Sequence, residues 1–295
     1  MLECVVNVSE GTRTDLVQAV AASAGEALID LHSDPWHNRS VLTLAGPEVV
    51  EAARAVASSA VELLHLSEHS GAHPRLGVVD VVPFAPILDA PAAAGAVELS
   101  EATRERDRFA RWAARALCLP CFLYGPERSL PELRKGAFRT IAPDTGPRRP
   151  HPSAGAACVG ARGPLVAYNL WLEGGDSRLA KAIARSIRRP GLRALGLDLG
   201  GRAQVSCNVV DPALVGIGAV YDEVRRRAAV ERPELVGLLP SWVLEAEPRR
   251  RWAELGLSED RTIEARLQGG AAASRRQAPA GRELRRGEGA DGQGR

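Results

Sequence analysis

The segment "HLSEHSGAHPRLGVVDVVPFAP", residues 65–86, concentrates side chains that can do chemistry. Three of the chain's six histidines, His65, His69 and His73, lie within nine residues, and Arg75 follows closely. Imidazole titrates near neutral pH, so a loop histidine held by rigid elements can act as a general acid or base. A nearby arginine can pair with a substrate carboxylate through two parallel hydrogen bonds. The segment therefore combines proton transfer with anion binding.

The same histidines also fit two other interpretations. His69 and His73 are four residues apart, the spacing of two metal ligands on one helical turn. Gly71 lies between them and Pro74 follows, so a helix is disfavoured and a metal site with it. A loop histidine can also be purely structural, and residue types alone do not separate that interpretation from catalysis.

The elements that must position this segment form a repeated pattern. In the first half, strand and helix patterns alternate over residues 2–8, 14–27, 27–32, 39–46, 47–64, 76–84, 104–117 and 121–125. In the second half, the same order returns over residues 165–172, 176–189, 192–200, 203–211, 212–230 and 234–240. Thr14 is expected to cap the first helix, and Pro47 and Pro212 to open the long helices.

The repeat predicts an α+β fold made of two similar split β-α-β subdomains with the order β-α-β-β-α-β. Each subdomain is expected to be a sheet with helices on one face. Two such layers cover their open faces most simply against each other, which places a ligand groove between the sheets.

The halves are joined by residues 139–164, which are rich in proline and glycine and are expected to lack regular structure over most of their length. A connection this long is usually functional or disordered. Its Arg148, Arg149 and His151 favour an anionic ligand, whereas a plain interdomain linker fits the composition equally well.

Composition excludes some classes of protein. The net charge of +2 gives no argument for a nucleic-acid or membrane partner. Residues 275–295 are rich in Arg and Gly and are expected to form a solvated, disordered tail, with RNA binding as the alternative. Absence of a signal or membrane-spanning pattern predicts a cytoplasmic protein. Cys118 and Cys121 form C-x-x-C but are expected to be ordinary buried cysteines, because an apolar strand follows them.

Six motifs resemble the formiminotransferase family and appear in chain order. They are "ECVVNVSEG" (3–11), "HNRSVLTLAG" (37–46), "HSGAHPRLGVVDVVPF" (69–84), "YGPE" (124–127), "VGARGPLVAYN" (159–169) and "GRAQVSCNVVD" (201–211). The resemblance extends to about residue 268. It implies two similarly folded subdomains whose sheets face a shared folate-binding tunnel. It also implies transfer of a formimino group between N-formiminoglutamate and tetrahydrofolate, in histidine degradation and one-carbon metabolism.

The resemblance also implies site residues. His73, in the G-x-H-P-R motif, is the expected catalytic residue. The expected folate-binding segment comprises Gly146, Pro147, Arg148, Arg149, Pro150, His151, Pro152, Ser153, Ala154 and Gly155. The expected substrate-binding residues are Asn7, Glu10, Asn38, Arg39, Arg75, Asp80, Arg162 and Asn169. A carboxylate is expected to assist His73, and Asp30, Asp34, Asp80 and Glu10 are all candidates for it.

We expect residues 1–163 to form the N-terminal subdomain, 164–268 the C-terminal subdomain and 269–295 the tail. Tetrahydrofolate is the expected co-substrate, and formiminoglutamate or glutamate is the second small-molecule partner. No metal is expected. The sequence leaves open whether the protein forms a homodimer. We expect no cyclodeaminase domain of the kind that some family members append, so ammonia release would need another protein. Val6 and Val8 depart from the family's pattern. The alternative is therefore a folate-binding protein with lost or altered one-carbon transferase activity.

Overall fold

The structure is a computed structural model that describes residues 1–71, 74–91 and 97–269 of the 295-residue chain. His73 and the tail from residue 270 onward lie outside the described residues. The catalytic role of His73 and the disorder of the tail therefore stay predictions.

The first sheet has six strands in the order β2-β3-β1-β4-β6-β5. Its first four strands are antiparallel and belong to one β-α-β-β-α-β unit, whereas β6 and β5 extend the sheet in parallel beyond β4. The unit comprises β1 (Leu2–Val8), α1 (Thr14–Ala22), β2 (Leu28–Asp34), β3 (Arg39–Ala45), α2 (Val49–Leu63) and β4 (Val79–Pro86). The extension comprises α3 (Ser100–Ala116), β5 (Cys121–Tyr124), α4 (Leu130–Gly136) and β6 (Ala157–Ala161).

The second sheet has four antiparallel strands in the order β10-β7-β9-β8. Its elements are β7 (Val166–Leu172), α5 (Ser177–Ile187), β8 (Leu192–Leu199), β9 (Arg202–Val209), α6 (Ile217–Arg225) and β10 (Val230–Val236). In both units the first strand lies between the third and the fourth, and the second strand is at the edge. The predicted α+β fold with a repeated unit is confirmed.

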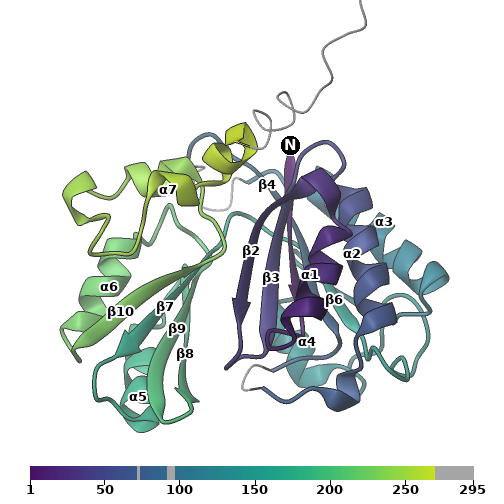
Figure 1. The fold of residues 1–295 in the computed structure, drawn as a ribbon, viewed down its shortest axis with the longest axis horizontal. Coiled ribbons are helices and arrows are strands. Elements are labelled where there is room, and N and C mark those ends of the chain that lie inside the picture. The colour runs from purple at the N-terminus through teal and green to yellow at the C-terminus, as the bar shows by residue number, and fades with distance from the viewer. Residues whose placement is uncertain (72–73, 92–96, 270–295) are drawn as a thin grey trace, which may run out of the picture.

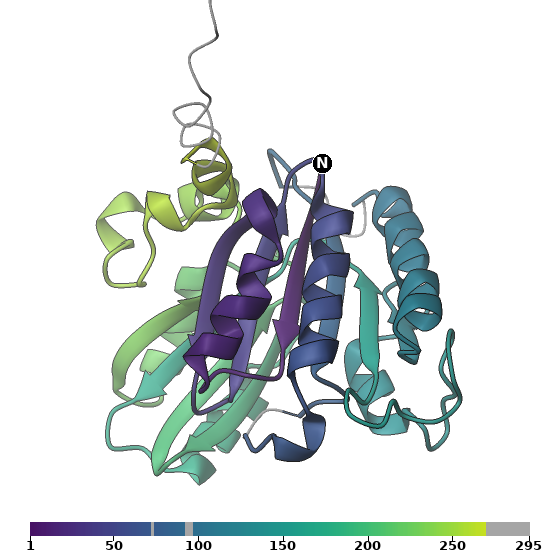
Figure 2. The same cartoon turned by 45° about the vertical axis from the view of Figure 1, so that its right-hand side comes forward.

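Helices cover the outer faces of both sheets, except for α4, which packs against the other face of the first sheet at β5 and β6. In Figure 1 the sheets face each other, with α5 and α6 on the outer side of one and α1, α2 and α3 on the outer side of the other. Figure 2 brings the layer of α1, α2 and α3 into view. After β10 the chain forms α7 (Ser241–Glu245) and a further helical stretch at residues 263–269. This C-terminal segment lies over one end of the two sheets (Figure 1).

On β1 and β7, side-chain alternation separates an apolar outer face from a polar inner face, as expected for strands buried on one side by helices. On β4, β5 and β6 the inner face instead carries an apolar cluster that packs against α4. On β1, Cys4 and Val6 belong to the hydrophobic core under α2, so Asn7 points to the opposite face. On β7, Leu170 belongs to the second core, and its neighbour Asn169 points away from that core. The polar residues therefore lie on the faces that the two sheets turn toward each other.

Several element boundaries differ from the sequence predictions. Thr14 is the first residue of α1 and not its cap, because the Glu10 carboxylate binds the preceding backbone amides. The helix predicted from Pro212 begins at Ile217, and residues 212–214 form a turn. The ring of Pro212 fits that turn as well as a first helical position.

The connection between the halves is more ordered than its composition predicts. Its last part forms β6, which lies between β4 and β5. Small residues at 157–161 allow this strand to be fully buried, although they give little β propensity. Cys121 is buried as expected, but Cys118 is exposed. Cys118 lies in the segment between α3 and β5 and adopts a left-handed backbone conformation with φ of 50°.

Candidate active site

The inner face of the first sheet carries two neighbouring rows of polar side chains. Strand register places Asp30, Thr43 and Val5 side by side on β2, β3 and β1. The next row consists of His32, Val41 and Asn7 on the same three strands. Asn7 and Thr43 are only 5% and 1% exposed, so their polar atoms are shielded from bulk water.

The inner face of the second sheet carries a fixed carboxylate, Glu234. Its register neighbour is Asn169, and both Asn169 Nδ2 and Trp171 Nε1 donate hydrogen bonds to Glu234 Oε2, at 3.3 and 3.0 Å. Burial disfavours ionisation of Glu234, but these donors and Arg232 outweigh burial and hold its pKa below the usual range. The guanidinium groups of Arg232 and Arg202 pack against the Trp171 ring at 4.8 and 4.6 Å from its centre.

Two contacts join the first sheet and its β2–β3 turn to the second sheet, and a third joins the first sheet to the C-terminal segment. His37 Nε2 lies 3.2 Å from Gln204 Oε1, and both side chains are buried. His32 Nε2 lies 3.9 Å from Glu234 Oε1. Burial lowers the pKa of His32, and nearby Glu234 only partly opposes this. At the end covered by the C-terminal segment, Arg266 lies 3.8 Å from Asp30 Oδ1. The predicted facing of the sheets is thus matched by specific polar contacts.

A second group of polar contacts holds the loops at one end of the first sheet. Asn38, which has a φ of 47°, accepts a hydrogen bond from the Gly11 amide at 2.8 Å and donates to the Ser70 carbonyl at 2.9 Å. His69 Nε2 lies 2.6 Å from the Asn38 carbonyl oxygen, so it hydrogen-bonds to the backbone. Asn38 therefore ties the loop after β1 to the loop that leads toward His73.

Asp80 and Arg134 hold the chain that follows residue 73. Arg134, on α4, donates to the Asp80 carboxylate and to the Pro74 carbonyl. Asp80 also accepts the Leu76 amide at 2.8 Å. Arg134 was not predicted from the sequence, because α4 lies about 60 residues from the histidine segment and only the fold brings the two together. The sequence does contain a signal for the helix that carries Arg134. It is the "SLPE" start of α4, where Ser129 and Glu132 form a capping box.

Glu10 is a loop anchor. Its carboxylate accepts the amides of Gly11, Thr12 and Arg13 at 2.8–3.0 Å and pairs with the Arg13 side chain at 2.7 Å. Burial opposes ionisation, but these donors lower the pKa of Glu10 to about 2. Arg13 also pairs with Glu68, so the loops after β1 and α2 are joined.

The three predicted arginines lie in different places. Arg39 is on the inner face of β3, and burial lowers its pKa to about 10, although Asp80 opposes this shift. Arg75 donates to the Gly71 carbonyl across the undescribed residues of its loop. Arg162 follows β6 and lies 3.7 Å from Glu3, on the inner face near the C-terminal segment. The structure therefore brings Arg39 and Arg75 near Asp80 and Arg134, and places Arg162 beside Glu3 instead.

The predicted folate-binding segment divides into two parts. Residues 151–155 form a tight turn, in which His151 and Gly155 exchange backbone hydrogen bonds of 2.8 and 3.0 Å. Gly155 has a φ of 72°, and a Cβ there would lie 2.3 Å from the Leu76 carbonyl, so only glycine permits this approach. This part therefore lies beside the chain after His73. Gly146 instead packs near Ala114 of α3, and the side chains of Arg148 and Arg149 are exposed.

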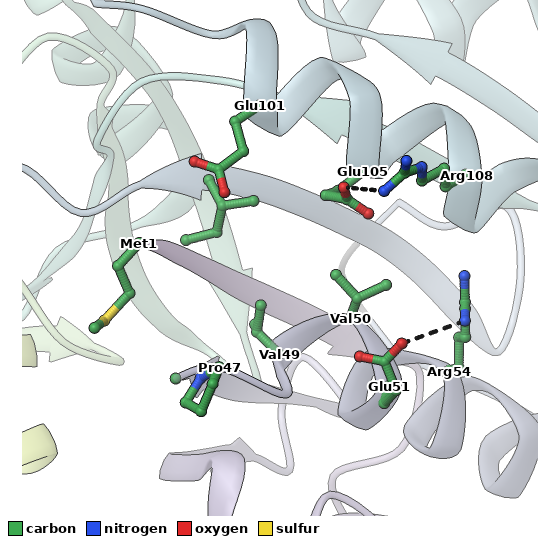
Figure 3. A pocket seen from close by; sticks show the side chains of 11 residues that line it. Met1, Pro47, Val49, Val50, Glu51, Arg54, Glu101, Glu105 and Arg108 are labelled. Atoms are coloured by element: carbon green, nitrogen blue, oxygen red, sulfur yellow. Dashed lines mark hydrogen bonds and ion pairs between the residues drawn. The ribbon is translucent and has the colours of Figure 1, made fainter.

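A separate pocket of about 530 Å³ lies between α2 and α3, beside the start of β1. Figure 3 shows two ion pairs at this pocket, Glu105 with Arg108 and Glu51 with Arg54, and a further carboxylate, Glu101. No described residue of the predicted site lines this pocket.

In the part of the chain that the structure describes, no three His, Cys, Asp or Glu side chains are placed to hold a metal ion. Over the same residues, no helix is long and apolar enough to cross a membrane.

The fold defines a two-unit α+β protein. The polar residues on its two facing inner faces are the candidate site. Comparison with known proteins identifies the family. The model of the family described as "Formiminotransferase domain, N-terminal subdomain" matches residues 1–162. A glutamate formimidoyltransferase of Streptococcus pyogenes is 36% identical, over 83% of this chain and 90% of that protein. A protein of the same name from Thermoplasma acidophilum is 31% identical, over 83% and 89% of the two chains.

A formimidoyltransferase-cyclodeaminase of Sus scrofa is 36% identical over 81% of this chain, but the match spans 50% of that protein. The chain thus corresponds to about half the length of the relatives with this double name. It belongs to the formiminotransferase family, whose named members are transferases. The family resemblance drawn from the six motifs is confirmed.

Proposed function

We propose that this protein is a glutamate formimidoyltransferase, which moves a formimino group between N-formiminoglutamate and tetrahydrofolate. The observation that carries the proposal is the 36% identity to the Streptococcus pyogenes protein of that name over 90% of its length. Tetrahydrofolate is then a co-substrate. We propose histidine degradation as the metabolic context and the cytoplasm as the location.

The chemistry requires one proton to move twice. The tetrahydrofolate amine attacks the amidine carbon of the formimino group, which gives a tetrahedral adduct and a positively charged folate nitrogen. A base then removes a proton from that nitrogen. The carbon–nitrogen bond to glutamate breaks as the leaving nitrogen receives a proton. One histidine can serve both steps in turn, and we assign them to His73.

The surroundings of the loop support this assignment. Asn38 and Arg134 hold the chain on the two sides of residues 72 and 73, through Ser70 and Pro74. Such anchoring limits the positions open to a catalytic side chain between them. Asp80 pairs with the same Arg134 that holds Pro74, so we favour it as the assisting carboxylate over Glu10, which binds residues 11–13 of another loop.

We further propose that substrates bind along the inner faces, where Asn7, Arg39 and Asn169 lie. Arg39 supplies a positive charge for the carboxylates that both substrates carry. Binding both substrates side by side converts a two-molecule encounter into an oriented reaction. Residues 151–155 are suited to contact the folate, because they lie beside the chain that follows His73.

The alternative, a folate-binding protein with lost or altered transferase activity, rested partly on Val6 and Val8. Both are buried in the core under the helices, 0% and 2% exposed, and point away from the inner face. These departures therefore change core packing and give no reason to expect lost activity. Incubation with tetrahydrofolate and formiminoglutamate, followed by the absorbance of the amidine product, separates the two functions. Binding without turnover would favour the alternative.

A further inference from the structure

Among the residues that the structure describes, three buried oxygen atoms on the inner face of the first sheet have no hydrogen-bond donor. They are Asn7 Oδ1, Thr43 Oγ1 and Asp30 Oδ2. Leaving a buried acceptor unpaired costs about 1–3 kcal/mol, so such groups are rare unless they have a function. Three of them in neighbouring positions indicate a shared cause.

The three acceptors form one patch. Asp30 and Thr43 are directly opposite each other on β2 and β3, and Thr43 is opposite Val5 on β1. Asn7 Nδ2 donates to the Val5 carbonyl at 2.9 Å, which holds its amide beside the same row. Three adjacent strands span about 10 Å, so one ligand of modest size can reach all three oxygens.

The second sheet adds a charged acceptor near this patch. Glu234 is held by Trp171 and Asn169 through Oε2, and its Oε1 lies 3.9 Å from His32 Nε2 of the first sheet. The cations at the rim are Arg232, 3.5 Å from Glu234, and Arg266, 3.8 Å from Asp30. Both are more than a third exposed, so solvent screens them. Arg261, which donates to the Leu235 and Gly237 carbonyls, is a third cation near His32. The patch therefore combines three unpaired oxygens of the first sheet with the fixed Glu234 carboxylate of the second.

We propose that Asn7, Asp30, Thr43 and Glu234 form an acceptor-lined subsite for a planar N–C–N group with adjacent N–H donors. Asn7 Oδ1, Thr43 Oγ1 and Asp30 Oδ2 can each accept one such donor, and Glu234 Oε1 can accept another, because its Oε2 is already held by Trp171 and Asn169. The inference rests on the proposed function, because both proposed substrates carry this group. One source is the amidine of formiminoglutamate, and the other is the 2-amino-pyrimidinone edge of the folate pterin.

Two variants test the subsite without turnover. Thr43→Val removes one unpaired hydroxyl and keeps the shape of the side chain. Glu234→Gln removes the charge and keeps a carbonyl oxygen for Trp171. Glu231→Gln is the matched control, because Glu231 is on the same strand, is exposed and pairs with Arg202 at 2.6 Å. Equilibrium dissociation constants are measured for tetrahydropterin, tetrahydrofolate, formiminoglutamate and glutamate, one ligand at a time.

Thr43→Val should weaken one class of ligand by about 3- to 10-fold, and Glu234→Gln by about 10-fold or more, as expected for a neutral and a charged hydrogen bond. Glu231→Gln should change nothing beyond twofold. Losses for tetrahydropterin and tetrahydrofolate assign the subsite to the pterin. Losses for formiminoglutamate, with glutamate unchanged, assign it to the amidine. The melting temperature of Thr43→Val should stay level or rise, because an unpaired buried hydroxyl is removed.

Folded variants that bind all four ligands within twofold of wild type would overturn the inference. A wild-type protein that binds none of the four ligands would overturn it as well. If the variants show these binding losses but the wild type does not turn over the substrates, the proposed function fails and the subsite stands.

Discussion

The guanidinium of Arg134 and the carboxylate of Asp80 form an ion pair between α4 and β4, and the same guanidinium donates to the Pro74 carbonyl. The side chains are 16% and 3% exposed, so the pair is largely shielded from water. It joins an element of the first sheet's extension to the chain directly after His73.

Replacing Arg134 by Gln should destabilise the fold, because it leaves the Asp80 charge buried without its partner. Breaking a buried pair costs about 3–5 kcal/mol, and residual exposure of Arg134 favours the lower end. Urea denaturation of wild type and variant measures the difference in free energy of unfolding. The control is Arg225→Gln, which breaks an exposed pair with Glu254 and should cost less than about 1 kcal/mol. Equal effects at the two sites would contradict a structural role for the buried pair.

The stability contributed by Glu10 should depend on pH. The pKa of Glu10 falls from an ordinary 4.5 to about 2 in the folded protein. A depressed pKa stabilises the folded state above pH 4.5, and this stabilisation is lost as pH falls toward 2. Glu10→Gln should therefore lose about 3 kcal/mol at pH 7 and much less near pH 2. Chemical denaturation between pH 2 and pH 7 measures the free energy of unfolding of wild type and variant. A difference that does not depend on pH would show that the geometry of the hydrogen bonds matters more than the charge of Glu10.

Arg148 and Arg149 provide a test of the predicted folate-binding segment. If these exposed side chains face the glutamate tail of folate, replacing both by Gln should weaken binding of a polyglutamylated folate more than of a monoglutamylated one. Each contact should contribute about 1 kcal/mol or less and weaken as salt rises. Turnover at saturating folate should be nearly unchanged, because the contact is the same in ground and transition states. An equal loss for both ligands would place the arginines outside the tail path.

Much of the fold could be predicted from local sequence patterns. The period of two in β1 and β7 and the repeated element order indicated the two units, because these patterns report which face of each strand is buried. The position of β6 in the sheet, between β4 and β5, could not be predicted. It depends on long-range pairing, and the small residues at 157–161 carry little strand signal.

The site was predicted less completely. Glu10 and Asn38 lie in family motifs, yet their contacts hold loops together, and sequence alone cannot separate anchoring from substrate binding. Arg134, His32 and Glu234 were not predicted as site residues, because each becomes relevant only through a partner on a distant element. Polar residues at alternate positions of β1, β2 and β10 carried the available signal.

His73 should be far more important for turnover than His69. His73→Ala should lower turnover by about 10²- to 10⁴-fold, the scale of one general acid–base group, and leave folate binding nearly intact. His69 hydrogen-bonds to the Asn38 carbonyl at 2.6 Å, so His69→Ala should act mainly through loop stability and cost less activity. Equal losses at both positions, restored by added zinc, would instead indicate a metal site.

Transfer of a formimino group to tetrahydrofolate is the activity on which the assigned roles of these residues depend. Its most direct measurement is the steady-state formation of the amidine product from tetrahydrofolate and N-formiminoglutamate, followed by absorbance, with His73→Ala and Glu231→Gln run in parallel. We expect saturable turnover in the wild type and in Glu231→Gln, and a loss of at least about 100-fold in His73→Ala. Absence of product with wild-type protein that binds both substrates, or full activity of His73→Ala, would contradict the proposed function.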